Sequence, residues 1–92
     1  MKKDCLKYIK SKVHTDLMYI RINQQQCLLV NLSGSEENLS LELAEIEWLI
    51  QDFEFQYFDP GLLVLRRYLF KIDQDGKGIV LKIGKKVLRV PI

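Results

Sequence analysis

Few side chains in this sequence are able to do acid–base or nucleophilic chemistry. The one histidine, His14, is followed by Thr15 and Asp16, and a carboxylate beside an imidazole can hold a general base in position. No serine or cysteine stands in a motif that would give such a base a nucleophile to activate. We therefore predict that His14 caps a helix or lies at the surface, and that the chain is neither an enzyme nor dependent on a cofactor.

The run Asp73-Gln74-Asp75-Gly76-Lys77-Gly78 has the spacing of the first ligands of a calcium-binding loop. Such a loop needs oxygen ligands at its first, third and fifth positions and a bidentate acid at its twelfth. The fifth position is Lys77 and the twelfth is Gly84, and neither supplies an oxygen ligand. Because the flanking residues are β-formers, we predict a turn between two strands and no metal site.

Charge is segregated along the chain. Residues 33–59 contain eight acids and no lysine or arginine, whereas residues 60–92 contain eight bases and two acids. The bases on the predicted C-terminal strands that could contact a phosphate backbone are Arg66, Arg67, Lys82, Lys85, Lys86 and Arg89. Nucleic-acid binding through these residues is the alternative function. Exposed lysines and arginines on a sheet also discourage edge-to-edge aggregation, which is the simpler explanation of the same pattern.

The spacing of apolar residues predicts the elements that would position these side chains. Residues 4–13 have a helical period, and residues 17–22 and 27–32 are β-prone runs joined by a polar loop, which predicts a hairpin. On one face of it we expect Met18, Ile20, Ile22, Leu28, Val30 and Leu32. Further strands are predicted at 54–58, 62–72, 79–83 and 87–92. Because Pro91 lacks an amide donor, the last of them should lie at a sheet edge or lose its pairing there.

A long amphipathic helix is predicted over residues 36–53. Ser33 and Glu36 fit a helix-start capping box. The stripe expected to face the core comprises Leu39, Leu43, Ile46, Leu49, Ile50 and Phe53. The predicted fold is therefore α+β, with the order α-β-β-α-β-β-β-β. An antiparallel sheet of about five to six strands has this helix packed across one face and a short N-terminal helix beside it.

A second apolar line, formed by Leu41, Ala44 and Trp48, lies opposite the main stripe of this predicted helix. A helix on a sheet needs only one apolar face, so something else must cover the second one. The N-terminal helix, a second subunit or a partner protein could do so, and Trp48 is the natural anchor because large aromatic side chains dominate interface energetics.

Length and composition define the class of protein. The 92 residues are expected to form a single domain, and 48% of them are hydrophobic, as in ordinary globular proteins. No apolar run approaches a membrane span, and Cys5 and Cys27 cannot assemble a zinc site or a disulfide framework, so we expect a cytoplasmic protein without membrane contact. The leading hypothesis is a non-enzymatic protein-interaction domain, a small adaptor, chaperone or inhibitor, that binds a protein partner or itself as a homodimer.

Overall fold

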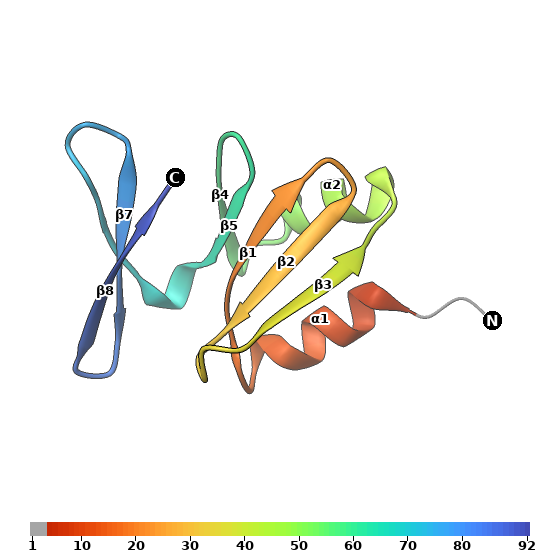
Figure 1. The fold of residues 1–92 in the computed structure, drawn as a ribbon, viewed down its shortest axis with the longest axis horizontal. Coiled ribbons are helices and arrows are strands. Elements are labelled where there is room, and N and C mark those ends of the chain that lie inside the picture. Colours follow the sequence, from red (N-terminus) through yellow and green to blue (C-terminus); the bar gives the residue numbers. More distant parts are fainter. Residues whose placement is uncertain (1–3) are drawn as a thin grey trace.

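The computed structural model describes residues 4–92 and has an α+β fold with two helices and antiparallel sheets (Figure 1). The class and the antiparallel pairing agree with the sequence-based prediction. In chain order the elements are α1 (Cys5–Val13), β1 (Leu17–Asn23), β2 (Gln26–Asn31), β3 (Glu36–Ser40), α2 (Leu43–Gln51), β4 (Phe55–Phe58), β5 (Leu62–Leu65), a 3-10 turn (Arg66–Tyr68), β6 (Leu69–Ile72), β7 (Gly78–Ile83) and β8 (Lys86–Pro91).

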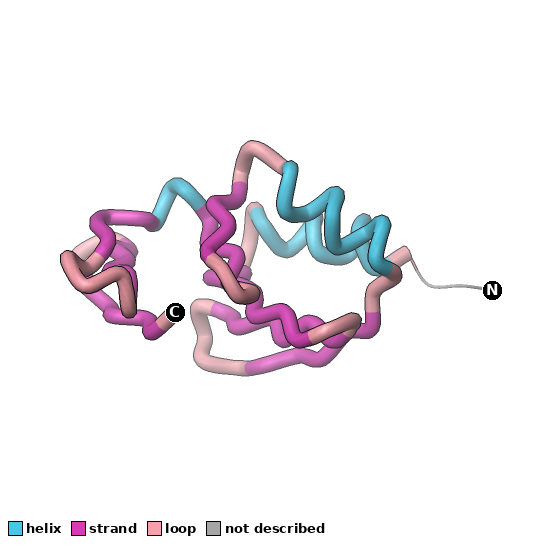
Figure 2. Tube along the Cα trace, turned by 90° about the horizontal axis from the view of Figure 1, so that it is seen from above, coloured by secondary structure: helices cyan, strands magenta, loops and turns pink. Residues whose placement is uncertain are grey.

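The first sheet has five antiparallel strands in the order β3-β2-β1-β5-β4, and both helices lie on one of its faces (Figure 2). Strand alternation directs Ile20 of β1 and its cross-strand partner Leu29 of β2 toward the helices. There they pack with Ile9 of α1 and with Ile46 and Leu49 of α2 in one buried cluster. This cluster fixes the position of both helices on the sheet.

A second sheet, of three strands in the order β6-β7-β8, covers the opposite face of the five-stranded sheet. Ile79 and Leu81 of β7 are fully buried against Val64 of β5 and Met18 of β1, in a second cluster separate from the first. The molecule thus has three layers: helices, five-stranded sheet and three-stranded sheet. In Figure 1 the three-stranded sheet lies at one end of the long axis, and α1 and β3 lie toward the other.

The long helix predicted over 36–53 is wrong at both ends. Residues 36–40 form β3, which pairs with β2, and the helix is confined to Leu43–Gln51. Leu39 and Leu41 both contact the first core cluster, which a strand achieves by alternation, whereas a helix would separate them by about 200°. Leu43 and Phe53 were expected to face the core, and both are exposed.

The predicted hairpin exists, but its faces are wrong. Ile20 pairs with Leu29 and Ile22 with Cys27, so these residues share the face toward the helices, and Val30 points to the second core cluster. A bulge between Leu17 and Tyr19 places Met18 on the face opposite Ile20, so Met18 also belongs to the second cluster.

The predicted single sheet of about five to six strands is wrong, because the residues that the structure describes form two sheets, of five and three strands. The predicted strand 62–72 is interrupted by the 3-10 turn Arg66–Tyr68, which carries the chain from one sheet to the other. The edge position predicted from Pro91 is confirmed, because β8 is an outer strand.

Candidate protein-interaction surface

Helix α2 is positioned by its first turn and by its buried side. The Glu42 side chain accepts from the backbone of Glu45, and the Glu45 carboxylate accepts from the Glu42 amide at 2.9 Å, so the two residues form a reciprocal capping box. Ile46 and Leu49 lie one turn apart and are buried against the sheet. The opposite side of the helix must therefore face outward.

That outward side carries the aromatic residue singled out from the sequence. Ala44 and Trp48 lie one turn apart and are both exposed, with 45% of Trp48 accessible to solvent. Phe53, just beyond the end of the helix, borders the same hollow as Trp48 and is 80% exposed. We call these three residues, Ala44, Trp48 and Phe53, the α2 surface.

Leu41 does not belong to this surface. It precedes α2 and is only 3% exposed within the first core cluster, so the predicted line Leu41–Ala44–Trp48 is broken at its first member. The physical reason is that α2 begins after Leu41, which points inward from the extended segment that follows β3. Ala44 and Trp48, the other two members of the line, are exposed.

Helix α1 covers Trp48 only in part. The Lys10 ammonium lies 5.4 Å from the centroid of the Trp48 ring, and its Nζ donates to Asp52 Oδ2 at 2.7 Å. Burial raises the pKa of the Asp52 carboxyl, but the hydrogen bonds from Lys10 and from the Glu54 amide outweigh burial and leave that pKa below its usual value. A hollow of about 390 Å³ lies beside Trp48 and is lined by Lys10, Trp48, Gln51, Asp52 and Phe53.

A polar cluster that sequence reasoning missed attaches α1 to the edge of the five-stranded sheet. The carboxylate of Glu37 on β3 accepts from Tyr8 and Lys12 of α1, and from Asn31 Nδ2 at 2.9 Å. These hydrogen bonds, that of Lys12 foremost, lower the pKa of Glu37 to about 2. The hydrogen bond to Glu37 raises the pKa of Tyr8. The cluster holds α1 in the position from which Lys10 reaches Trp48.

The six bases of the alternative prediction do not form one face. Arg66 and Arg67 lie in the 3-10 turn, where Arg66 Nε donates to Phe55 O at 2.9 Å and Arg67 lies 3.7 Å from Glu54 Oε2. Lys82 pairs with Val87, and Lys86 with Ile83, so alternation points Lys82 and Lys86 to opposite faces. Lys85 occupies the turn between β7 and β8.

Arg89 is bound by a carboxylate. Its guanidinium makes a 2.7 Å ion pair with Asp73 in the turn before β7. This turn contains the run Asp73–Gly78, which has the spacing of a calcium-binding loop. As predicted, it joins two strands, β6 and β7. Within it the Lys77 amide donates to Asp75 Oδ1 at 2.9 Å. Asp73 therefore neutralises one of the bases that a phosphate backbone would need.

The remaining candidates lie apart from the α2 surface. His14 is the C-cap residue of α1 and is exposed. Within residues 4–92, no group of three or more His, Cys, Asp or Glu side chains is placed to hold a metal ion. No helix in the same part of the chain has the length and apolar character needed to cross a bilayer.

Comparison with models of known protein families, with curated proteins and with solved structures found no match to this chain.

Proposed function

We propose that the chain is a non-enzymatic protein-interaction domain of the cytosol, acting as a small adaptor, chaperone or inhibitor, and that the α2 surface contacts its partner. The partner is another protein or, in a homodimer, a second copy. The observation that carries this proposal is the exposure of the Trp48 indole, at 45%, beside the Phe53 ring, at 80%, on one side of the molecule.

The free energy available to a partner comes from apolar area. Burial of apolar surface contributes about 25 cal/mol per Å², and contiguous exposed apolar residues mark interaction sites more often than isolated ones do. Trp48 and Phe53 border the same hollow, so an apolar side chain of a partner can contact both rings at once. Tryptophan is enriched among the residues that dominate measured binding energies.

The surface is also held in place before a partner arrives. Trp48 lies on a helix whose buried side is packed against the sheet, and Lys10 restrains its ring from the neighbouring helix. Lys10 is itself fixed by its ion pair with Asp52, at 2.7 Å. A preorganised site loses less conformational entropy on binding than a mobile one, which favours recognition by this face.

Site-specific photocrosslinking tests this proposal. Benzoylphenylalanine replaces Ala44, which is exposed one turn from Trp48, and in a matched control it replaces Leu32, which is 37% exposed in the turn after β2. We expect illumination in the cells that make the protein to yield a defined protein adduct from position 44. The additional change Trp48→Ala should remove this adduct, and position 32 should give none.

Equal adducts from positions 44 and 32, or none from position 44, would contradict the proposal. Far-UV circular dichroism of each variant shows whether the fold is retained, so loss of the adduct can be separated from loss of structure.

A further inference from the structure

The outer face of the three-stranded sheet is a second surface that combines exposed apolar and charged side chains. Ile79, Leu81 and Val90 point inward to the second core cluster, so alternation directs Lys82 and Arg89 outward. Val87, the cross-strand partner of Lys82, shares this face and is 59% exposed. We call Phe70, Lys82, Val87 and Arg89 the sheet surface.

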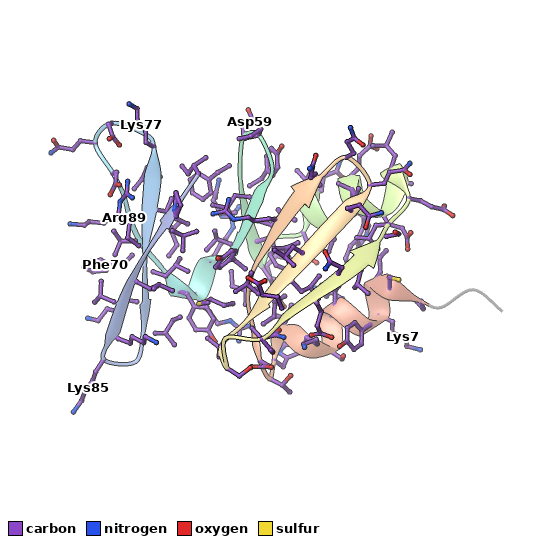
Figure 3. The ribbon with its side chains drawn as sticks, viewed as in Figure 1. Lys7, Asp59, Phe70, Lys77, Lys85 and Arg89 are labelled. Carbon is purple, nitrogen blue, oxygen red and sulfur yellow. The ribbon has the colours of Figure 1, made fainter. Side chains whose placement is uncertain are left out.

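Phe70 gives the sheet surface an aromatic anchor. It is 56% exposed, and the ammonium of Lys82 lies 5.5 Å from its ring centroid, as Lys10 lies over Trp48 on the α2 surface. Figure 3 shows Phe70 and Arg89 on the side of the three-stranded sheet that faces away from the five-stranded sheet. The inner residues of this sheet are covered, but among residues 4–92 no helix or further sheet packs over its outer face.

The two surfaces carry opposite charge. Residues 69–92 contain six bases and two acids, and one of those acids, Asp73, is paired with Arg89. Around the α2 surface the acids are Glu42, Glu45 and Glu47, while Lys10 is paired with Asp52. Helix α1, in the same layer, also carries Lys7, which is exposed, and Lys12, which is paired with Glu37. An acidic apolar helix face and a basic apolar sheet face are complementary.

Contact between these surfaces within one chain is ruled out by the layer order. The helices cover one face of the five-stranded sheet, and the three-stranded sheet covers the other, so the two outer surfaces point in opposite directions. The complementary surfaces can therefore meet only between two molecules. Because two different surfaces are joined, such a contact is head-to-tail and leaves one free surface of each kind.

We infer that the α2 surface of one copy binds the sheet surface of a second copy, so that the protein assembles head to tail through Trp48 and Phe53 on one side and Phe70 and Val87 on the other. This inference rests on the proposed function and specifies the partner as the chain itself. A two-copy complex is then the shortest member of a series that grows by further copies into a closed ring or an open filament.

Two charge-reversal variants test the inference. The helix variant is Glu47→Lys with Gln51→Lys, and the sheet variant is Lys71→Glu with Lys82→Glu. All four positions are exposed, and Lys71 pairs with Val80 and so shares the outer face with Lys82. The control, Lys7→Glu with Lys77→Glu, changes the net charge as the sheet variant does but lies outside both surfaces.

Sedimentation velocity from micromolar to millimolar concentration provides the measurement. We expect the wild-type chain and the control to associate increasingly with concentration and less at high salt, and each variant alone to associate at least about tenfold more weakly. An equimolar mixture of the two variants should recover association, because the reversed helix face then meets the reversed sheet face, and the unaltered sheet face of the helix variant meets the unaltered helix face of the sheet variant. Copies of the two variants should therefore alternate in an assembly that grows as the wild-type assembly does.

A wild-type chain that stays monomeric throughout would overturn the inference, as would a dimer that survives the sheet variant or a mixture that fails to associate. Such a result leaves the photocrosslinking test intact: a monomeric chain that still gives a Trp48-dependent adduct with another protein retains the proposed function and lacks only self-assembly. Conversely, loss of the position 44 adduct without loss of association would remove the proposed function.

Discussion

The ammonium group of Lys10 lies over the indole of Trp48, 5.4 Å from the ring centroid, and joins α1 to the outward side of α2. The same ammonium neutralises Asp52, whose side chain is 4% exposed. Lys10 thus couples the position of the interaction surface to the packing of the N-terminal helix.

Replacing Lys10 with methionine tests that coupling, because methionine keeps the apolar stem and removes the charge. We expect Lys10→Met to lower the free energy of unfolding by about 1 kcal/mol, since Asp52 loses its partner. Urea denaturation followed by tryptophan fluorescence measures the change. Lys7→Met, at an exposed position of the same helix, is the control and should alter stability by less than about 0.5 kcal/mol.

Glu37 should contribute to stability through its charge. Glu37→Gln retains the shape but weakens the hydrogen bonds from Lys12, Tyr8 and Asn31. Because the side chain is 32% exposed and partly screened by water, we expect a loss of about 1 kcal/mol at neutral pH. Chemical denaturation of the two proteins under identical conditions gives the difference. An unchanged midpoint would show that the cluster adds nothing to stability.

The same residue predicts a pH dependence. The pKa of Glu37 in the folded chain is about 2, below the ordinary value of 4.5, so the folded state favours the ionised form. Its contribution is therefore fully present above about pH 4.5 and is lost as the pH falls toward 2. The stability difference between the wild type and Glu37→Gln should shrink over that window. A constant difference from pH 6 to pH 2 would contradict the assignment.

Truncation of Leu41 and truncation of Trp48 should have different effects on stability and on partner binding. Leu41→Ala removes a side chain from the core and should cost about 2–4 kcal/mol of unfolding free energy. Trp48→Ala removes a half-exposed ring and should cost clearly less, while abolishing the position 44 adduct. Thermal denaturation and photocrosslinking of both variants separate the two roles. If the two variants lost the same unfolding free energy, Trp48 would be a core residue and not part of an interaction surface.

Gly61 should tolerate no side chain. A Cβ at this position would lie 2.2 Å from the backbone oxygen of Ile22, whose amide donates to Gly61 O at 2.7 Å. We expect Gly61→Ala to destabilise the fold by about 2–4 kcal/mol, because the backbone itself must move. Gly84→Ala, at φ +62° with open space around it, should cost only about 1 kcal/mol. Urea denaturation ranks the two variants.

Cys27 should be chemically silent in the folded chain. Burial, with smaller effects from Cys5 and Glu45, raises the pKa of its thiol to about 11, so little thiolate is present at pH 8. A Cys5→Ser variant leaves Cys27 as the one cysteine and should react with a thiol reagent only as fast as the chain unfolds. Rapid labelling without denaturant would show that the core around β2 opens.

Local patterns predicted the elements better than they predicted how those elements meet. The first helix and the hairpin strands were found close to their expected bounds because each combines a clear period with a flanking polar loop. Residues 36–40 were misassigned because leucines spaced by three and four residues mask the two-residue period of Leu39 and Leu41. The break at Arg66–Tyr68 contains neither proline nor glycine, so nothing marks the change of sheet.

The candidate site was predicted in part for the same reason. Ala44 and Trp48 lie within the observed helix, where period alone predicts an outward position. The contact of Lys10 with Trp48 and that of Tyr8 with Glu37 join residues from different parts of the chain. Such contacts depend on how α1 is placed across the sheet, which no local pattern determines.

The position of the 3-10 turn in the sequence also sets the order in which the two sheets are synthesised. Every strand of the five-stranded sheet precedes Arg66, and every strand of the three-stranded sheet follows Tyr68. As the chain leaves the ribosome, its first two layers can close while Met18, Val30 and Val64 still face water. The three strands that emerge last then cover this apolar face. A chain truncated before Arg66 would therefore expose it and be prone to aggregation.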